Sequence, residues 1–314
     1  MTQGTSSGKT LTSKYAGLPG STGRQLLPPG KSFGFIFGEP GCGKSHLMES
    51  HDGAFIFNLD QTSTSNPTPA AVTWPTVDSD GVPIDASGIK YAVTWPEVNK
   101  VIDILVEMAE NKQPRPETIV FDSLTSMIAL LKEWAPEGLP FATTTGKDFR
   151  ELDGHMAWDF VYDTILRMSR RLRQAGYGVW LVGHTVKEKQ YDKNGNVVGT
   201  KTVPTFTQAI WKRLFPQFEI SATITKKKVH LKTPKTEVIQ LSGGKTRTRE
   251  TTETKQTTQY TFGFNVEDLK DFYKGRAYPE VILPPIGAWA VFCTAYQSEL
   301  ESNLNAMQEI NNDN

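Results

Sequence analysis

The sequence predicts an α/β protein with a mostly parallel central sheet and helices on both faces. Three observations support this prediction. Apolar runs of strand length alternate along the chain with segments whose apolar residues recur at helical spacing. A glycine-rich turn follows the first of these runs, and polar side chains follow the later ones. In a parallel sheet these positions meet at one edge, which is the edge where ligands bind.

The composition is that of an ordinary globular protein and excludes a strongly basic or acidic chain. Of the 314 residues, 38% are hydrophobic and 22% are charged, and the formal net charge is zero. A nucleic-acid surface must therefore be a local patch. The two cysteines are Cys42 and Cys293, and Cys42 lies inside the glycine-rich turn. We expect no disulfide, a reducing intracellular setting and, since no signal peptide or bilayer-length apolar run is evident, no membrane association.

The chain divides into three predicted parts. The first is rich in Gly, Ser and Thr, and it cannot bury enough apolar surface to offset the entropy of ordering. The central part carries the alternation of strands and helices. One of its inserts is a long polar connection, with a short hairpin expected near Gly81. The parts are a flexible arm at 1–25, a core at 26–290 with inserts at 62–90 and 221–262, and a C-terminal helix with a polar tail at 291–314.

Local patterns predict the individual elements in order. The strands are short apolar runs, and the run at 179–182 is expected to finish at Gly183-His184. The helices have apolar residues three and four apart, with Pro96 in a first turn and Gly176 as a terminator. Residues 192–196 predict a turn, and the tail is expected to fray from Asn305. The predicted strands are 33–37, 54–59, 118–122, 179–182 and 281–283, and the predicted helices are 45–50, 96–109, 123–134, 161–175 and 289–304.

The glycine-rich turn is the most specific motif. It satisfies the pattern G-x-x-x-x-G-K-[ST] of phosphate-binding loops and stands between a predicted strand and a predicted helix. Its glycines let successive N–H groups point at phosphate oxygens, and the helix N-terminus adds its dipole. Lys44 supplies a mobile charge for the outer phosphates, and the Ser45 hydroxyl is a ligand for Mg²⁺. The predicted nucleotide-binding residues are Gly38, Glu39, Pro40, Gly41, Cys42, Gly43, Lys44 and Ser45.

Side chains at two other strand ends are candidates for metal binding and water activation. Asp122 closes an apolar strand, where its carboxylate would order Mg²⁺ together with Ser45, or would only cap the next helix. Hydrolysis also needs a group that orients or deprotonates water. Asp60 and Gln61 close the second strand and are the main candidates, unless Asp60 is simply a turn residue. Glu39, inside the loop, is a weaker candidate.

Three further residues are candidates for coupling and charge stabilisation. His184 ends a strand that we expect next to the strand of the phosphate loop, so its hydrogen bonds would change when the terminal phosphate leaves. A histidine after a buried strand is also often structural. Lys274 and Arg276 form a K-x-R pair far along the chain. They are either an exposed turn or a charge pair that reaches the nucleotide of a neighbouring subunit.

The region 220–262 is locally basic. It is rich in Thr, Val and Ile, alternates in polarity around Ser242-Gly243-Gly244, and holds nine Lys or Arg against three Glu. Alternation of this kind predicts antiparallel hairpins. Their charged face is either solvated or binds nucleic acid through phosphate contacts. The arginines of the helix 161–175 are more typical of a solvated or interface face, and no Cys/His cluster has zinc spacing.

Four segments together resemble the short RecA-like ATPases of bacteriophages. These proteins are described as phage nucleotide-binding proteins, and one branch as Sak-type single-strand annealing recombinases. The resemblance covers roughly residues 30–285, and it departs from RecA proteins at Asp60-Gln61, where they carry a glutamate. The segments are Gly38-Glu39-Pro40-Gly41-Cys42-Gly43-Lys44-Ser45, Ile119-Val120-Phe121-Asp122-Ser123-Leu124-Thr125, Leu181-Val182-Gly183-His184 and Lys274-Gly275-Arg276.

The resemblance implies a RecA-like fold that binds ATP and Mg²⁺ and hydrolyses ATP between the protomers of a ring or filament. Loops facing the axis would hold single-stranded DNA, and Lys274 and Arg276 would act in trans. The implied role is annealing or strand exchange in phage recombination or replication, in the cytoplasm of an infected bacterium. A single-strand binding protein is a further expected partner. A helicase or translocase of the same fold and an oligomeric scaffold with little turnover remain alternatives, and a small-molecule kinase is disfavoured.

Overall fold

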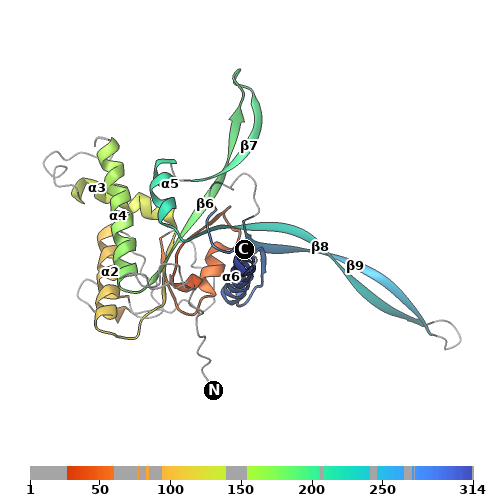
Figure 1. Cartoon of the computed structure of the whole chain (residues 1–314). Coiled ribbons are helices and arrows are strands. Elements are labelled where there is room, and N and C mark those ends of the chain that lie inside the picture. The colour runs from red at the N-terminus through yellow and green to blue at the C-terminus, as the bar shows by residue number, and fades with distance from the viewer. Residues whose placement is uncertain are drawn as a thin grey trace.

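An eight-stranded sheet lies at the centre of the computed structural model of the chain (Figure 1). The strand order is β10-β9-β8-β1-β6-β5-β2, and β7 pairs with β6 off this path. Strands β2, β5, β6, β1 and β8 run parallel to one another, whereas β7, β9 and β10 pair antiparallel with their neighbours. The predicted α/β class with a mostly parallel sheet is therefore confirmed. The structure describes residues 27–59, 76–77, 83–84, 94–138, 154–205, 208–240, 246–264, 271 and 273–312.

The strands of the parallel core lie close to the predicted apolar runs. Two of them, β6 and β8, begin in the core and continue far beyond it, each with an antiparallel partner. Two very short strands, β3 and β4, pair antiparallel on either side of Gly81, as the expected hairpin requires. The bounds are β1 Phe33–Gly38, β2 Ala54–Asn58, β3 Thr76–Val77, β4 Pro83–Ile84, β5 Thr118–Asp122, β6 Gly178–Tyr191, β7 Val197–Pro204, β8 Ile220–Gln240, β9 Thr246–Gly263 and β10 Val281–Leu283.

Helices cover both faces of the sheet. Side chains of a strand alternate between its two faces, so the apolar strands present apolar side chains on both. Phe33, Phe35 and Phe37 of β1 join a core that includes residues of α2, α3, α4 and α5. Ile36 of the same strand joins a second core, which includes residues of α1 and α6. The helix bounds are η1 Pro29–Lys31, α1 Lys44–Glu49, α2 Trp95–Glu110, α3 Leu124–Gly138, α4 Gly154–Gln174, α5 Gln208–Leu214, η4 Phe215–Gln217 and α6 Ala288–Asn312.

Register within the sheet brings the predicted strand ends to one edge. Gly38 of β1 is level with His184 of β6, and Asp122 of β5 is level with Val182. On the other flank of β5, Asp122 is level with Asn58 of β2. The phosphate loop and the predicted acid therefore lie on strands separated by β6 alone.

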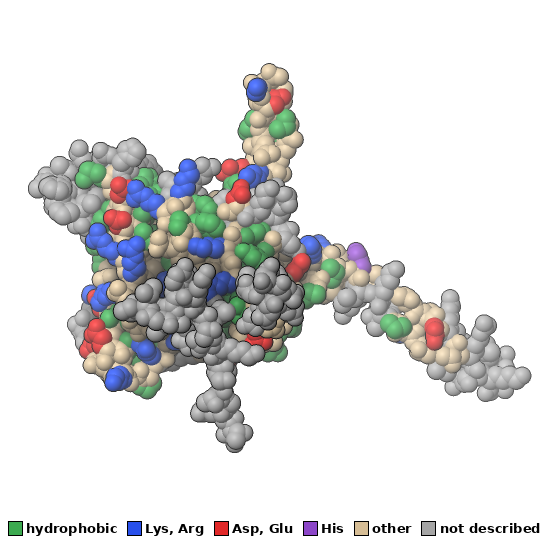
Figure 2. Space-filling model, viewed as in Figure 1, with side chains coloured by type: hydrophobic (Ala, Val, Ile, Leu, Met, Phe, Trp, Pro, Cys, Tyr) green, Lys and Arg blue, Asp and Glu red, His purple; other side chains and the backbone are tan. Residues whose placement is uncertain are grey.

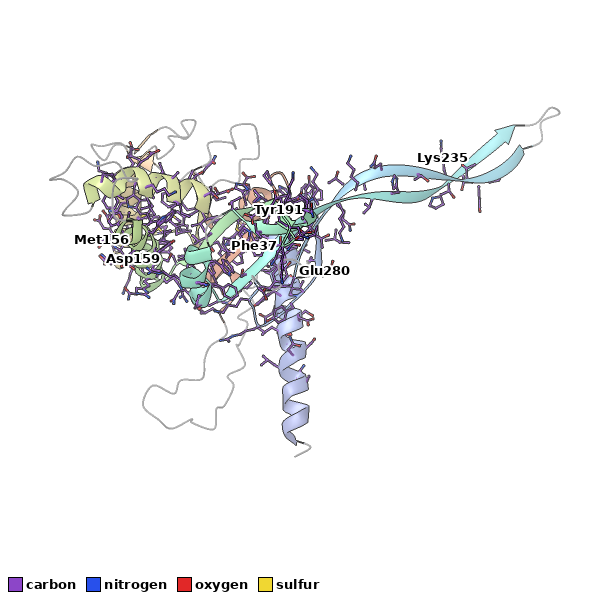
Figure 3. The ribbon with its side chains drawn as sticks, turned by 90° about the horizontal axis from the view of Figure 1, so that it is seen from above. Phe37, Met156, Asp159, Tyr191, Lys235 and Glu280 are labelled. Atoms are coloured by element: carbon purple, nitrogen blue, oxygen red, sulfur yellow. The ribbon has the colours of Figure 1, made fainter. Side chains whose placement is uncertain are left out.

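Two hairpin arms leave the body of the molecule (Figure 1). The first is formed by the outer part of β6 with β7, from the pair Thr185 and Pro204 to the turn after Tyr191. The second is the long hairpin of β8 and β9, which begins beside β1 and extends to Gln240. Figure 3 shows Lys235 far out on this second arm. We refer to them as the β6–β7 arm and the β8–β9 arm.

Two predicted ends are wrong. The strand expected to finish at His184 continues to Tyr191, because β7 supplies a hydrogen-bonding partner beyond the edge of the sheet. The C-terminal helix, expected to fray from Asn305, continues to Asn312. Its first turns are anchored by the buried side chains of Trp289, Phe292 and Tyr296, and a helix that has been nucleated propagates at low cost.

Other expectations from the sequence are confirmed or lie outside the described residues. The basic region forms one hairpin, whose turn around Ser242-Gly243-Gly244 lies outside the described residues. The predicted flexible arm at 1–25 and most of the insert at 62–90 also lie outside them. Cys42 and Cys293 are free, as expected. None of the helices in the described ranges combines the length and the apolar character that a bilayer span requires.

Candidate functional site

The loop between β1 and α1 depends on glycine at two positions. Gly41 and Gly43 have φ angles of 71° and 95°, a region that residues with a side chain rarely adopt. Gly43 is the N-cap residue of α1, so the first N–H groups of this helix open toward the loop. Among the described residues, and apart from Gly41 and its two chain neighbours, no heavy atom lies within 4 Å of the position that a Cβ would take at Gly41. The loop therefore offers backbone donors and open space, which suit a phosphate group.

Lys44 is a buried cation at the base of this loop. Lys44 is only 4% exposed, and its ammonium donates to the carbonyls of Gly38 at 3.0 Å and Glu39 at 2.9 Å. Burial raises the pKa of the neighbouring Cys42 thiol, so this neighbour stays neutral. Within the described part of the chain, Lys44 makes no salt bridge. A buried ammonium without a counter-charge is costly, and a bound phosphate would supply that charge.

Ser45 and Asp122 meet beside Lys44, although 77 positions separate them in the sequence. The Ser45 hydroxyl donates to Asp122 Oδ2 at 2.5 Å, and Asp122 is 7% exposed. The peptide bond from Asp122 to Ser123 is cis. A hydroxyl and a carboxylate this close present two oxygen ligands to one small cation, which is the donor set that Mg²⁺ uses beside phosphate oxygens and water.

The donor set fits magnesium bound with a nucleotide better than a cation held by protein alone. Within the described ranges, no three His, Cys, Asp or Glu side chains come together as a metal-binding group. Magnesium is often held by one or two protein oxygens, with substrate phosphates and water completing its octahedron. Ser45 and Asp122 would therefore hold Mg²⁺, and Lys44 with the loop amides would hold the phosphates.

His184 lies on the strand next to the loop, as predicted. It pairs in register with Gly38, and its backbone carbonyl accepts hydrogen bonds from the N–H of Thr205 at 2.9 Å and from the hydroxyl of Thr205 at 3.2 Å. Thr205 in turn shares a 2.9 Å hydrogen bond with Thr125, which follows the Asp122 strand. The root of the β6–β7 arm is therefore hydrogen-bonded to His184, beside the loop strand, and to Thr125, just after the Asp122 strand.

The predicted water-activating residues lie at the border of the described chain. Asp60 and Gln61 themselves are outside the described residues. The residue before them, Leu59, donates its N–H to the carbonyl of Asp122 at 2.6 Å. Glu39, the weaker candidate, has its carboxylate 3.3 Å from the ammonium of Lys187, and both side chains are largely exposed.

Lys274 lies away from the phosphate loop of its own chain, and Arg276 follows it by two residues. Lys274 pairs with Ser221 of β8, which is level with Phe35, three residues before Gly38. At the rise of a strand this is about 10 Å along the sheet. The Lys274 ammonium donates to the carbonyl of Pro216 at 2.8 Å, and burial lowers its pKa. By contrast, Arg276 is exposed, and its guanidinium makes no salt bridge to the described residues.

Two groups of basic residues differ in how they are used. Arginines of α4 are used within the chain, because Arg171 pairs with Asp103 of α2 and Arg173 pairs with Glu219 at 2.6 Å. The β8–β9 arm instead carries exposed lysines at its described positions, and it projects away from the body of the molecule (Figure 2). The exposed lysines of this arm in the described positions are Lys226, Lys227, Lys228 and Lys235.

Sequence patterns missed two contacts with the phosphate loop. Lys187 of the β6–β7 arm reaches Glu39, and Tyr260 of the β8–β9 arm packs against Gly43. Neither residue belongs to a motif, and each lies more than a hundred positions from its partner in the sequence. Only the strand order reveals them, since it places one arm on each side of β1.

A comparison with known families agrees with this geometry. A family model described as an AAA domain matches residues 31–260, which include the loop, Asp122, His184 and both arms. No curated protein shows a significant match to the chain. The matched family has the P-loop NTPase fold, and nucleotide binding and ATPase chemistry are its general properties. The match extends over more than half of the sequence, so the chain belongs to the AAA domain family of P-loop ATPases.

Proposed function

We propose that this protein is a Mg²⁺-dependent ATPase that acts on single-stranded DNA in phage recombination or replication, by annealing or strand exchange. The observation that carries the DNA part is the position of the basic β8–β9 arm. Its strand β8 is the direct neighbour of the loop strand β1, and Lys227, Lys228 and Lys235 on the arm are exposed. Exposed lysines along an extended hairpin bind phosphates without reading sequence, as annealing requires.

The loop residues have separate roles in the proposed reaction. Lys44 and the loop amides bind and orient the phosphates, and the buried position of Lys44 strengthens its interaction with charge that develops there. Bound Mg²⁺ would neutralise phosphate charge, and Ser45 with Asp122 would position it. Asp60 or Gln61 would orient the attacking water. His184, level with Gly38, would change its hydrogen bonds as the terminal phosphate leaves.

The proposed active form is a ring or filament with sites between subunits. Arg276 is the better placed of the two trans candidates, because its guanidinium is exposed while the Lys274 ammonium is bound to backbone carbonyls. Lys274 pairs with Ser221, about 10 Å along the sheet from the level of Gly38, which favours action on the nucleotide of a neighbouring subunit. A single-strand binding protein and a location in the cytoplasm of an infected bacterium complete this proposal.

The deciding experiment measures ATP hydrolysis with and without single-stranded DNA, together with particle size by light scattering. We expect hydrolysis that needs Mg²⁺, rises with DNA and is lost in Lys44→Ala, and we expect particles larger than one chain. Gel shifts at low salt should retain single strands in the presence of ATP. Failure to retain them would remove DNA from the proposal, and unchanged DNA-stimulated hydrolysis in the Lys274→Ala/Arg276→Ala variant would remove the trans role.

The same assays separate the two alternative functions. Strand unwinding without annealing would favour a helicase or translocase. Slow turnover, with Lys44→Ala still able to anneal DNA, would favour an oligomeric scaffold.

A further inference from the structure

The Ser45–Asp122 contact indicates which way a nucleotide would lie across the phosphate loop. Asp122 lies on β5 and His184 on β6, and both strands are on one side of the loop strand β1. Magnesium and the outer phosphates would lie on that side. A triphosphate that crosses the loop from there has its nucleoside on the opposite side of β1, toward β8 and β9. This step rests on the proposed nucleotide binding.

An aromatic side chain lies on that opposite side. A Cβ built at Gly43 would come within 3.1 Å of Tyr260 Cδ1, 3.5 Å of Cγ and 3.6 Å of Cε1, so the ring borders the loop directly. Tyr260 is half-buried, which leaves part of it accessible. The ammonium of Lys226, its partner in register, lies 5.9 Å from the ring centroid and adds positive charge beside it.

The ring is held by its neighbours on the same face of the sheet. Phe262, two residues along β9, and Ile224, two residues before Lys226, are fully buried in the core with α6. Leu283 of β10 is the partner of Tyr260 on the other edge of β9 and is also buried. Tyr260 therefore stands where the arm leaves the sheet, and its position is fixed by packing against buried neighbours.

We propose that Tyr260 contacts the nucleoside of the bound nucleotide and that the root of the β8–β9 arm is part of the nucleotide site. Every nucleobase has a π-face, so an aromatic contact of this kind favours nucleotides over bare phosphates without selecting one base. The ligand class is a nucleoside triphosphate, with ATP and GTP affected alike. The contact would also join the nucleotide directly to the arm that carries the exposed lysines.

The test compares ATP with inorganic tripolyphosphate by calorimetry, in the presence of Mg²⁺ and on the full chain. Tyr260→Leu removes the ring and keeps an apolar side chain in the strand. We expect it to weaken ATP and GTP binding roughly tenfold, in line with the cost of losing one aromatic contact with a base, while tripolyphosphate binding is unchanged. Tyr260→Phe keeps the ring and should bind ATP within about twofold of the wild type.

Tyr278→Leu is the matched control, since Tyr278 is a 55% exposed tyrosine on the segment before β10, and it should change neither affinity. Should Tyr260→Leu fold poorly, NMR of the wild type with labelled tyrosine rings gives a second readout. The Tyr260 ring signals should shift with ATP and stay in place with tripolyphosphate.

Three results would overturn the inference. They are unchanged ATP affinity in Tyr260→Leu, an equal loss for ATP and tripolyphosphate, and wild-type binding of the two ligands with equal strength. In all three cases the loop still binds phosphates, so nucleotide binding itself survives. A wild type that binds neither ligand would instead refute the proposed function.

Discussion

The two arms begin alike and end differently. Each grows from a strand that pairs with β1, and each touches the phosphate loop near its root. The β6–β7 arm ends in exposed apolar side chains, with Tyr191 61% and Val198 63% exposed. The β8–β9 arm is rich in Thr and Lys instead. The sheet therefore sets where an arm starts, whereas the residues beyond the sheet set what the arm can bind.

The exposed side chains in the described parts of the two arms suggest a division of labour. Exposed apolar side chains gathered at a turn are typical of contacts with protein or with stacked bases. Exposed lysines at intervals along a strand suit a phosphate backbone. If the arms differ in this way, changes to their side chains should have unequal effects.

The largest effect is expected from the charge of the β8–β9 arm. Replacing Lys227, Lys228 and Lys235 with Gln should weaken binding of single-stranded DNA roughly 100-fold at 0.1 M salt and reduce the salt slope by about 2. Fluorescence anisotropy over a salt series measures both quantities.

The matched control replaces Lys189, Lys193 and Lys201 on the β6–β7 arm with Gln. It should reduce affinity much less than the β8–β9 substitutions. Equal losses in the two variants would mean that both arms bind the DNA backbone, and the proposed difference would be wrong.

The contact of the β8–β9 arm with the phosphate loop should affect the free energy of unfolding of glycine variants in the loop. Gly43→Ala and Gly41→Ala both force a side chain into left-handed backbone, at a cost of about 1–2 kcal/mol each. Only Gly43→Ala also places a Cβ against the Tyr260 ring, at 3.1 Å. We therefore expect Gly43→Ala to have the lower free energy of unfolding in urea. Equal values for the two variants would show that the ring moves aside freely.

The turn of the β6–β7 arm should respond to acid. The N–H groups of Asn196 and Asn194 donate to Asp192 Oδ1, and these hydrogen bonds, with Asn196 foremost, hold the pKa of Asp192 below its ordinary value of 3.8. Because the pKa is lowered in the folded chain, the ionised carboxylate stabilises the turn at every pH above that ordinary value. The stabilisation is lost as pH falls through the lower, folded-state pKa.

Amide NMR signals of Asn194 and Asn196 followed from pH 5 downward measure this loss. We expect them to shift together as Asp192 takes up a proton. Asp192→Ala should remove the transition, and a transition that persists in this variant would assign it to another group.

The smallest effect is expected at the root of the β6–β7 arm. Lys187 and Glu39 form an exposed ion pair, and pairs of this kind contribute about 0.2–1 kcal/mol. A double-mutant cycle with Lys187→Gln and Glu39→Gln should give a coupling within this range that disappears in about 1 M NaCl, where the Debye length is short. A larger coupling that resists salt would show that this contact is not an ordinary exposed ion pair.

The sequence predicted the parts of the site that depend on local pattern. A glycine loop between a strand and a helix has a spacing that few other structures need, so residues 38–45 could be recognised directly. Asp122 and His184 could be placed because the carboxyl ends of parallel strands share an edge. Local signals were weaker at β6, where Gly183-His184 suggests an end although the strand continues to Tyr191.

Tertiary structure alone decided how the two arms meet the loop. The contact of Tyr260 with Gly43 and that of Lys187 with Glu39 join residues far apart in the chain, and neither residue carries a motif. They depend on strand order and register, which place β8 and β6 on either side of β1. Periodicity in a sequence fixes which face a side chain takes within its own strand, but the identity of the neighbouring strand follows from packing of the whole chain.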